Sequence, residues 1–577
     1  MVWLAALVGF GHLASFVVCR RWGTRSRLEA SAWIGLVLFA LLASALQLVV
    51  PLTGTVSASM FGFMGLIGVI NTFRIAWTMR GSLLAALSGS LSVRRWPVYL
   101  LLALFSLGLG LTANFALAEP MDYDAGLYRI SAILYAQDYR LPPGLANLHG
   151  RLGFNSSIWP LAALMGIGIW EGQSFRLISG LFITVLYWSI VMRVAFVRRG
   201  GSLPGDWFTV LGGAFVAAMV FTDSGRWIPS PAQDLVLLIA GIGSTAYFVD
   251  YLFRRTSRTS AALALVLAAF AGTLRPLGWV LFASTLLVLL ALLLRPKATA
   301  SELLARAWNA IGRSLVVSAI LLVVMLVRDL FLSGWLLYPL TYAPMPVDWR
   351  APDPTSVRNW ITWYARAPGT DGTSAQDGSW IGPWLQSAWA SREIAVSRWL
   401  VVASVAPLLW RKGRLAWARS WKMIALGTIP SFAVVIIWLI TAPDVRFGWL
   451  GILGMAAIPV SILLSADAYP YWVARITGVL LLVLLMLTQV LNSRVFPRGA
   501  DREPIELKAG PISFTIQIAP SPRPITIPGT LADDTLVTYT TGDPNCWELF
   551  PLCLPGGEGS NVERRGPALE DGFRTIR

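Results

Sequence analysis

The sequence is poor in histidine, cysteine and charged residues, and each shortage argues against a class of function. Its 577 residues include two histidines and three cysteines, too few for a zinc site with the usual ligand spacing. Neither a Gly-x-Ser-x-Gly elbow nor a Walker phosphate loop occurs, which argues against serine hydrolases of that type and against ATP-driven transport. Charged residues make up only 13% of the chain and hydrophobic residues 56%, which excludes an ordinary soluble protein.

Long apolar segments dominate the chain and predict an all-α integral membrane protein. About fourteen segments reach or approach the ~20 apolar residues that a helix needs to cross a bilayer. They cover residues 2–19, 30–52, 56–79, 96–118, 174–197, 207–222, 233–253, 259–274, 277–294, 311–333, 397–410, 421–441, 446–466 and 470–492. Residues 156–172 are apolar but short, and fit a re-entrant or interfacial helix. The first segment is expected to be an anchor and not a cleaved signal, because its charges follow it.

Basic residues gather in short connections between the apolar segments. The formal net charge of +16 would suggest nucleic acid as the partner of a soluble chain. Here clusters such as Arg20-Arg21, Arg198-Arg199 and Arg254-Arg255 follow the positive-inside rule, so the expected partner is the lipid bilayer and no nucleic acid. If the cluster after Cys19 is cytoplasmic, the segments outside are 119–155, 223–232, 334–396, 442–445 and the tail after 493.

The chain divides into three regions: N-terminal transmembrane helices (1–95), a transmembrane domain (96–492) with outer loops 119–173 and 334–396, and a terminal region (493–577). The terminal region alternates like short strands at 513–518 and 535–540, which predicts a small β-rich domain outside the cytoplasm. Cys546 and Cys553 lie in it and suggest one disulfide bond in an oxidising compartment.

Polar side chains predicted on the outer face are the functional candidates, because charged groups beside a bilayer are costly unless solvated or paired. Asp122 and Asp124 follow an apolar segment, and five outer connections carry an acid, an arginine or both. Such side chains could meet in one cavity. The remaining candidates for substrate binding are His149, Arg151, Asn155, Asp234, Arg275, Arg328, Tyr338, Trp363, Arg366, Asp444 and Arg446.

Each candidate has a chemical role and a structural alternative. A carboxylate can act as general base on a hydroxyl, or bind a divalent cation, but Asp122 and Asp124 could also cap a helix. Arginines suit a phosphate, yet Arg275 and Arg446 could be interfacial residues and Arg328 a local ion pair. The tryptophans of loop 334–396 could stack on sugars or form an aromatic belt at the lipid boundary.

Several segments resemble the GT-C superfamily of polytopic membrane glycosyltransferases, and within it a bacterial family of multi-pass membrane proteins. They include 123–128, 143–157, 441–448, and Cys546-Trp547 with Pro551 and Cys553. The resemblance implies a GT-C-like catalytic domain over 96–492, with Asp124 as the catalytic carboxylate and Asp122 as its partner or a metal ligand. The chain departs from that pattern at Ala125 and Arg129, where threonine and histidine are usual. Arg129 removes a possible metal ligand, so a need for Mg²⁺ or Mn²⁺ stays open and no cofactor is certain.

The resulting hypothesis is a hexosyl- or pentosyltransferase of the bacterial inner (plasma) membrane, acting in cell-envelope polysaccharide biosynthesis. It would move a sugar from a polyprenyl-phosphate donor to a glycan, lipid or protein acceptor on the extracytoplasmic face. Asp124 would take the acceptor proton, and Asp122 and His149 would shape the acceptor or metal site. Arg275, Arg328 and Arg446 would bind the donor phosphate. The alternatives are a transporter or flippase of lipid-linked saccharides, a glycan polymerase or ligase, and a non-catalytic scaffold.

Overall fold

The structure is a computed structural model that describes residues 2–18, 24–78, 96–195, 202–221, 226–254, 257–293, 300–367, 375–466, 503–509, 512–555 and 561–576. The apolar segment predicted at 470–492 lies outside these residues.

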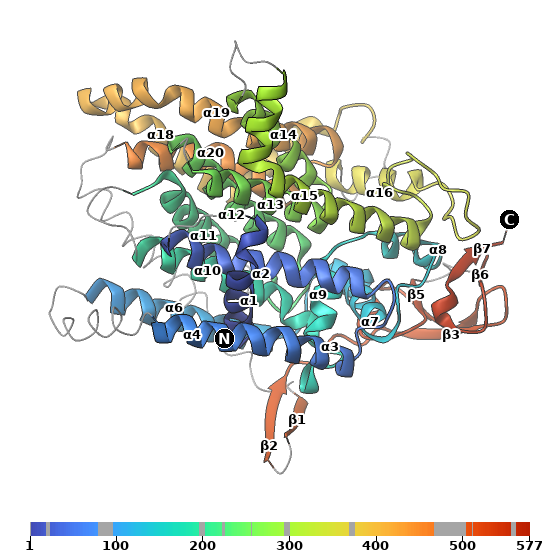
Figure 1. Cartoon of the computed structure of the whole chain (residues 1–577). Helices are drawn as coiled ribbons and strands as arrows, with labels where there is room; N and C mark the ends of the chain where they lie inside the picture. The colour runs from blue at the N-terminus through green and yellow to red at the C-terminus, as the bar shows by residue number, and fades with distance from the viewer. Residues whose placement is uncertain are drawn as a thin grey trace.

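Helices make up most of the described chain, and the strands lie toward its C-terminal end (Figure 1). The helices before the first outer loop are α1 (Val2–Val18), α2 (Thr24–Leu46), α3 (Gly54–Met60), α4 (Leu66–Thr78) and α6 (Trp96–Ala116). The loop contains α7 (Ile130–Asp138), α8 (Leu145–Leu148) and α9 (Ile158–Leu164). The following helices are α10 (Ile178–Ala195), α11 (Pro204–Phe221), α12 (Gln233–Phe253), α13 (Arg258–Leu274), α14 (Leu277–Leu293) and α15 (Ala300–Ser333). The last helices are α16 (Thr355–Arg366), α17 (Ile381–Ala390), α18 (Arg392–Val405), α19 (Arg411–Thr441) and α20 (Trp449–Ser465).

Seven helices of the described chain are long and apolar enough to cross a membrane. They cover Leu28–Leu46, Gly54–Ile75, Ser174–Val194, Gln233–Phe253, Trp308–Ser333, Arg411–Thr441 and Val445–Ser465. Shorter apolar helices cover Val2–Ser15, Phe105–Ala116, Pro204–Val220, Arg258–Leu274 and Leu277–Leu293. The chain is therefore a mainly helical membrane protein. The finer number of about fourteen crossings stays a prediction.

Helix α12 lies at the centre of the bundle. All of its membrane-length window is buried, and α11, α13 and α20 pack around it. A helix that is apolar on every side is stable only when other helices or lipid cover every side. Because α12 is covered by protein, the residues at its two ends are held in fixed positions, and its first turn contributes to the site described below.

The segment predicted as a re-entrant or interfacial helix does not form a long helix. Helix α9 has seven residues, all buried, and short 3-10 turns follow it at Gly168–Trp170 and Ser174–Arg176. At about 1.5 Å per residue, seven residues are far too short to cross a bilayer.

The C-terminal region is β-rich, as predicted. Its strands are β1 (Glu503–Ala509), β2 (Ile512–Ile518), β3 (Thr526–Thr530), β4 (Leu536–Thr540), β5 (Cys553–Pro555), β6 (Val562–Arg564) and β7 (Phe573–Thr575). They form an antiparallel β1–β2 hairpin, a sheet in the order β3-β4-β5, and an antiparallel β6–β7 pair. The strand segments predicted at 513–518 and 535–540 correspond to β2 and β4.

This β region contacts the loops at one end of the helices, where β5, β6 and β7 lie near α8 (Figure 1). The Phe573 amide donates to the Pro143 carbonyl at 2.9 Å. Arg565 Nε donates to Asp348 at 2.7 Å, which joins the β region to the loop after α15. The segment 119–173, predicted as the first outer loop, and the loop after α15 therefore both contact the terminal domain.

Close helix packing generates the first prediction. A Cβ on Gly35 of α2 would lie 2.1 Å from the Leu7 carbonyl oxygen of α1, whereas a Cβ on Gly110 of α6 would meet nothing within 4 Å. Small residues allow such close approach in membranes. We expect Gly35→Ala to destabilise the protein by roughly 1–3 kcal/mol, measured as a lower unfolding temperature in detergent. Gly110→Ala is the matched control, and equal unfolding temperatures for the two variants would contradict the packing described here.

Candidate functional site

Asp122 and Asp124 lie at the start of the first outer loop, directly before a π-helical turn at Ala125–Arg129. A π-turn bonds residues five positions apart, which is the separation of Asp124 and Arg129. Arg129 pairs with both carboxylates: with Asp122, and with Asp124 through Nη2 at 2.8 Å. Arg129 is only 1% exposed, and an unpaired charge at such a position would be very costly.

Two further arginines reach Asp124 from distant parts of the chain. Arg151, in the 3-10 turn Gly150–Gly153, donates Nη1 to Asp124 Oδ1 at 2.8 Å. Arg446, in the 3-10 turn Val445–Gly448 between α19 and α20, places Nη2 3.3 Å from Asp124 Oδ2. The Arg446 Nη1 atom lies 3.9 Å from Asp122 Oδ1. Asp124 therefore accepts from three guanidinium groups, of which that of Arg446 lies 322 residues away from it in sequence.

A second aspartate–arginine pair adjoins the first. Asp234, in the first turn of α12, pairs with Arg275, which ends α13. Arg446, which already contacts Asp124, links this pair to the two loop carboxylates, because its Nε lies 4.0 Å from Asp234. The same Nε lies 3.3 Å from Asp444. The Phe447 ring packs against the guanidinium groups of Arg275 and Arg446, and that of Arg275 lies 3.9 Å from the ring centre. We refer to these four aspartates and four arginines (Asp122, Asp124, Asp234, Asp444, Arg129, Arg151, Arg275 and Arg446) as the ion cluster.

The two loop carboxylates differ in proton affinity. Burial opposes ionisation of Asp124, but Arg129, Arg446 and Arg151 outweigh it and lower its pKa to about 2. Burial raises the pKa of Asp122 even though Arg129 acts in the opposite direction. The pKa of His149 falls to about 3, first through burial and then through the charge of Arg151. At neutral pH Asp124 is therefore ionised and the His149 ring is neutral.

Some predicted residues lie in other groups. Arg328 of α15 donates Nε to Asn155 at 3.1 Å. Its Nη1 donates to the Ser44 carbonyl of α2 at 3.3 Å and to Gln47, directly after α2, at 2.6 Å, so this side chain joins two helices. Tyr338 donates to the Gly150 carbonyl at 2.7 Å and thereby supports the turn that holds Arg151. Neither the Arg328 nor the Tyr338 contact reaches an aspartate of the ion cluster.

Helix α16 carries the predicted residues Trp363 and Arg366. The Trp363 ring lies 6.0 Å from that of Trp360, and the Arg366 guanidinium lies 5.1 Å from the Trp380 ring centre. Arg366 lines a cavity together with Asp444, so this helix borders the ion cluster through a shared hollow.

Sequence reasoning missed the roles of several members of the site. Arg129 stood among the polar residues of the first predicted outer loop and as a departure from a family pattern, but it was assigned no role, yet it contacts both carboxylates. Tyr128 donates to Gln233 at 3.1 Å, and Arg151 packs 4.1 Å above the Trp360 ring. The available signal for Arg129 was its charge within a run of apolar residues after two aspartates, because a buried cation needs nearby anions.

The residues that the structure describes contain no separate set of side chains arranged to bind a metal ion. Within the described residues, no three histidine, cysteine, aspartate or glutamate side chains are grouped as metal ligands. Asp122 and Asp124, the predicted ligands, instead face guanidinium groups. These two aspartates do not fit a divalent cation while the arginines hold them.

A second buried group of charges lies at the other end of α12. Arg193 of α10 pairs with Glu29 of α2 at 2.7 Å, with Asp250 at 2.8 Å and with Asp206 of α11 at 3.4 Å. Asp250 follows Asp234 by sixteen residues along α12, which is about 24 Å at about 1.5 Å per residue. That length approaches the ~30 Å of a bilayer core. The two charged groups therefore lie near the two ends of one buried helix that is long enough to cross a membrane.

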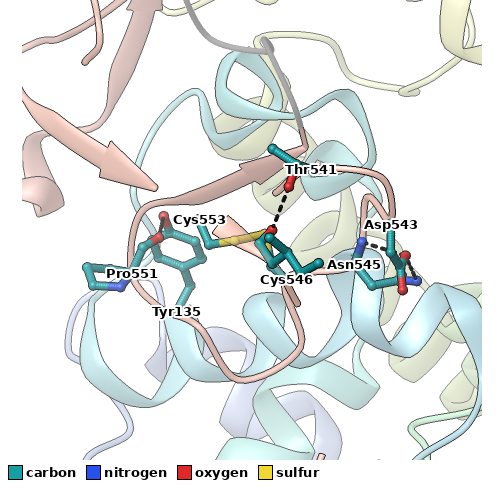
Figure 2. The surroundings of a disulfide bond; sticks show 8 residues. Tyr135, Thr541, Asp543, Asn545, Cys546, Pro551 and Cys553 are labelled. Atoms are coloured by element: carbon teal, nitrogen blue, oxygen red, sulfur yellow. Dashed lines mark hydrogen bonds between the residues drawn. A yellow bond between two sulfur atoms is a disulfide. The ribbon is translucent and has the colours of Figure 1, made fainter. Parts of the chain in front are cut away.

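A disulfide-closed loop of the terminal domain supports the π-turn. Cys546 and Cys553 form a disulfide bond, and Figure 2 shows Tyr135 of α7 beside this loop. The Tyr135 hydroxyl donates to the Pro551 carbonyl at 2.6 Å. The Trp547 amide donates to the Gly126 carbonyl at 2.9 Å. A Cβ on Gly126 would lie 2.6 Å from the Trp547 indole, so only glycine allows this approach.

The second prediction concerns this support. Trp547→Ala removes the indole that covers Gly126, so we expect faster amide hydrogen exchange in peptides that cover residues 122–130. Leu549→Ala, in the same disulfide loop but 40% exposed, is the matched control and should leave the exchange of these peptides unchanged. Unaltered exchange in the Trp547 variant would show that the terminal domain does not hold the π-turn.

Comparisons with known proteins place the chain in a family. A family model with the description "Domain of unknown function (DUF8201)" matches residues 1–453. The match includes the whole ion cluster and ends before the terminal domain. No curated protein and no solved structure matches the chain.

Proposed function

Because the chain belongs to the DUF8201 family, whose description assigns no activity, we propose a function from the site itself. The protein is a membrane glycosyltransferase that moves a sugar from a polyprenyl-phosphate donor to a glycan, lipid or protein acceptor. The reaction takes place at the extracytoplasmic face of the bacterial inner membrane. The main support for this proposal is that Arg129, Arg151 and Arg446, from three separate turns, all contact Asp124.

The arginines suit the donor phosphate. Guanidinium groups bind phosphate oxygens through paired donors and stay charged at every physiological pH. Arg446 and Arg275 are 19% and 22% exposed in their side chains, whereas Arg129 is 1% exposed. The two more exposed arginines therefore reach an incoming phosphate, and Arg129 holds Asp122 and Asp124 in position. Arg328, with its contacts to Asn155 and Gln47, joins helices and has no phosphate role in this proposal.

The low pKa of Asp124 requires a change of partners during the reaction. A carboxylate held by three cations is a weak base, and general-base catalysis works best near the operating pH. A bound phosphate attracts Arg446, which weakens its pull on Asp124 and raises the pKa of that carboxylate. Asp124 then accepts the proton of the acceptor hydroxyl as the oxygen attacks the sugar carbon and the phosphate leaves with its electron pair. Donor binding therefore activates the base.

Transport of lipid-linked saccharides fits the charge distribution less well. A translocation path needs polar groups at intermediate depth, but the two charged groups that α12 connects lie about 24 Å apart at about 1.5 Å per residue. The helix between them is buried against other helices. The ion cluster adjoins the outer loops, as a surface transfer reaction requires.

The third prediction tests the base. Asp124→Asn should lower transfer by about 10²–10⁴-fold, the usual contribution of a general base. It would be measured by analysing the surface glycans of a deletion strain complemented with each variant, looking for one missing sugar. Asp138→Asn, at an exposed aspartate of α7 in the same loop, is the matched control and should restore the glycan fully.

A second variant separates catalysis from folding. Asp124→Asn leaves three arginines short of one negative charge, whereas Asp124→Glu retains that charge and displaces the carboxylate by one methylene. We expect the glutamate variant to elute from size exclusion like the wild type yet transfer far more slowly. Full complementation by the asparagine variant would disprove the role of Asp124 as base.

A further inference from the structure

A cavity of about 500 Å³ opens beside the ion cluster. It lies between the end of α16, one face of α17 and the turn that begins at Asp444, and its lining includes Tyr364, Arg366, Trp380, Trp384, Ser387 and Asp444. Its volume falls within the range of about 300–1,000 Å³ that is usual for small-molecule sites. We propose that this cavity binds the sugar units of a neutral saccharide acceptor, which deepens and rests on the proposed glycosyl transfer.

The aromatic lining has the chemistry that sugar rings require. The Trp380 and Trp384 rings lie 5.9 Å apart in an edge-to-face arrangement, so they present two faces at a steep angle. The Trp384 indole is fixed, because its Nε1 donates to the Pro443 carbonyl at 2.6 Å and its ring lies 5.9 Å from Trp438. Rigid aromatic faces pack against the C–H side of a sugar with little loss of side-chain entropy.

The charges of the lining favour a neutral ligand. Among the lining residues that the structure describes, Arg366 and Asp444 are the charged side chains, one of each sign. Arg366 already donates Nη1 to the Ala375 carbonyl and Nη2 to the Ile440 carbonyl. A phosphate would gain little from this arginine and would be repelled by Asp444. Hydroxyl groups can instead bond to Asp444 and to Ser387.

The position of the cavity matches that of an acceptor. Asp444 lies 3.3 Å from Arg446 Nε, and Arg446 Nη2 lies 3.3 Å from Asp124. A saccharide in the cavity is therefore separated from the proposed base by one arginine side chain. When the donor phosphate draws Arg446 away, the acceptor hydroxyl at the end of the saccharide can reach Asp124.

Helix α17 presents one face to the cavity and an exposed apolar stripe on its other side. Its cavity face carries Trp380, Trp384 and Ser387, and its opposite stripe carries Ile381, Leu385 and Trp389, which are 47%, 55% and 62% exposed. Exposed apolar residues at four-residue spacing form one helix face, which suits contact with lipid. The helix thus separates lipid from the sugar cavity.

This arrangement divides the seven tryptophans of loop 334–396 by role. Trp335 and Trp349 donate to the Ala351 and Leu330 carbonyls and stabilise the loop. Trp360 packs against Arg151, and Trp363 packs against Trp360. Trp389 faces outward. Trp380 and Trp384 are the two that line the cavity.

Saccharide binding can be tested without transfer. The full-length protein in nanodiscs is applied to an array of immobilised neutral and charged oligosaccharides, and the dissociation constant of the strongest binder is then measured in solution. We expect a neutral member to bind, Trp380→Ala to weaken it about tenfold, and Trp380→Tyr to retain most of the affinity. Trp389→Ala, on the outer face of the same helix, is the matched control and should bind like the wild type.

The outcomes separate this proposal from the proposed function. Asp124→Asn should bind the saccharide as the wild type does while failing to transfer. If the wild type binds the saccharide but transfers no sugar, only the proposed transferase activity is contradicted. If the protein transfers sugar and Trp380→Ala leaves the KM for the acceptor unchanged, only the assignment of the cavity to the acceptor is contradicted. Weakened binding of polyprenyl phosphate, with saccharide affinity intact in Trp380→Ala, would assign the cavity to the lipid and overturn the proposal.

Discussion

The site depends on one constraint, that a charge removed from water needs a partner of opposite sign. Arg129 and Asp122 are 1% and 4% exposed, and neither could remain ionised at that depth alone. Removing one partner of a buried pair typically costs about 3–5 kcal/mol, because the other charge is left uncompensated. The need for pairing draws Arg151 and Arg446 to Asp124. The two 3-10 turns that carry these arginines are thereby held against the π-turn at Ala125–Arg129. The same rule operates around Arg193, at the other end of α12.

Support for the charged turns comes from outside the helix bundle. The π-turn that carries Arg129 is short, and its Gly126 provides no side chain for packing. Trp547 supplies the missing contact, held by a disulfide-closed loop whose Pro551 carbonyl accepts from Tyr135. A bundle of apolar helices has few ways to fix a polar loop at its end, and the small β domain beside the bundle provides one through its contacts with Gly126 and Tyr135. The terminal domain therefore belongs to the site in structural terms.

The sequence was sufficient to find charged members of the ion cluster but not their pairing. Asp122, Asp124, Asp234 and Arg446 stand out because charges are rare in apolar segments, and the positive-inside rule predicts that their loops share one face. Pairing depends on helix packing, which no single-sequence pattern encodes. Arg328 looked equivalent to Arg446, yet it joins α15 to α2 through the Ser44 carbonyl and bonds to Gln47 and Asn155. Glu29 and Arg193 were overlooked because neither lies in one of the predicted outer connections. The strands β2 and β4 were predictable, since their alternating pattern is local.

Charge balance links the ion cluster to its proposed reaction. Four aspartates and four arginines leave the ion cluster neutral if all are ionised, so a phosphate adds negative charge that the present pairs do not offset. Burial makes Asp122 the loop carboxylate with the higher proton affinity, whereas Asp124 keeps a pKa of about 2 while its arginines remain. A donor phosphate that draws Arg446 away would thus favour protonation of Asp122 and leave Asp124 ionised. The two neighbouring carboxylates then take different parts: Asp122 compensates the phosphate charge, and Asp124 remains available to receive the acceptor proton.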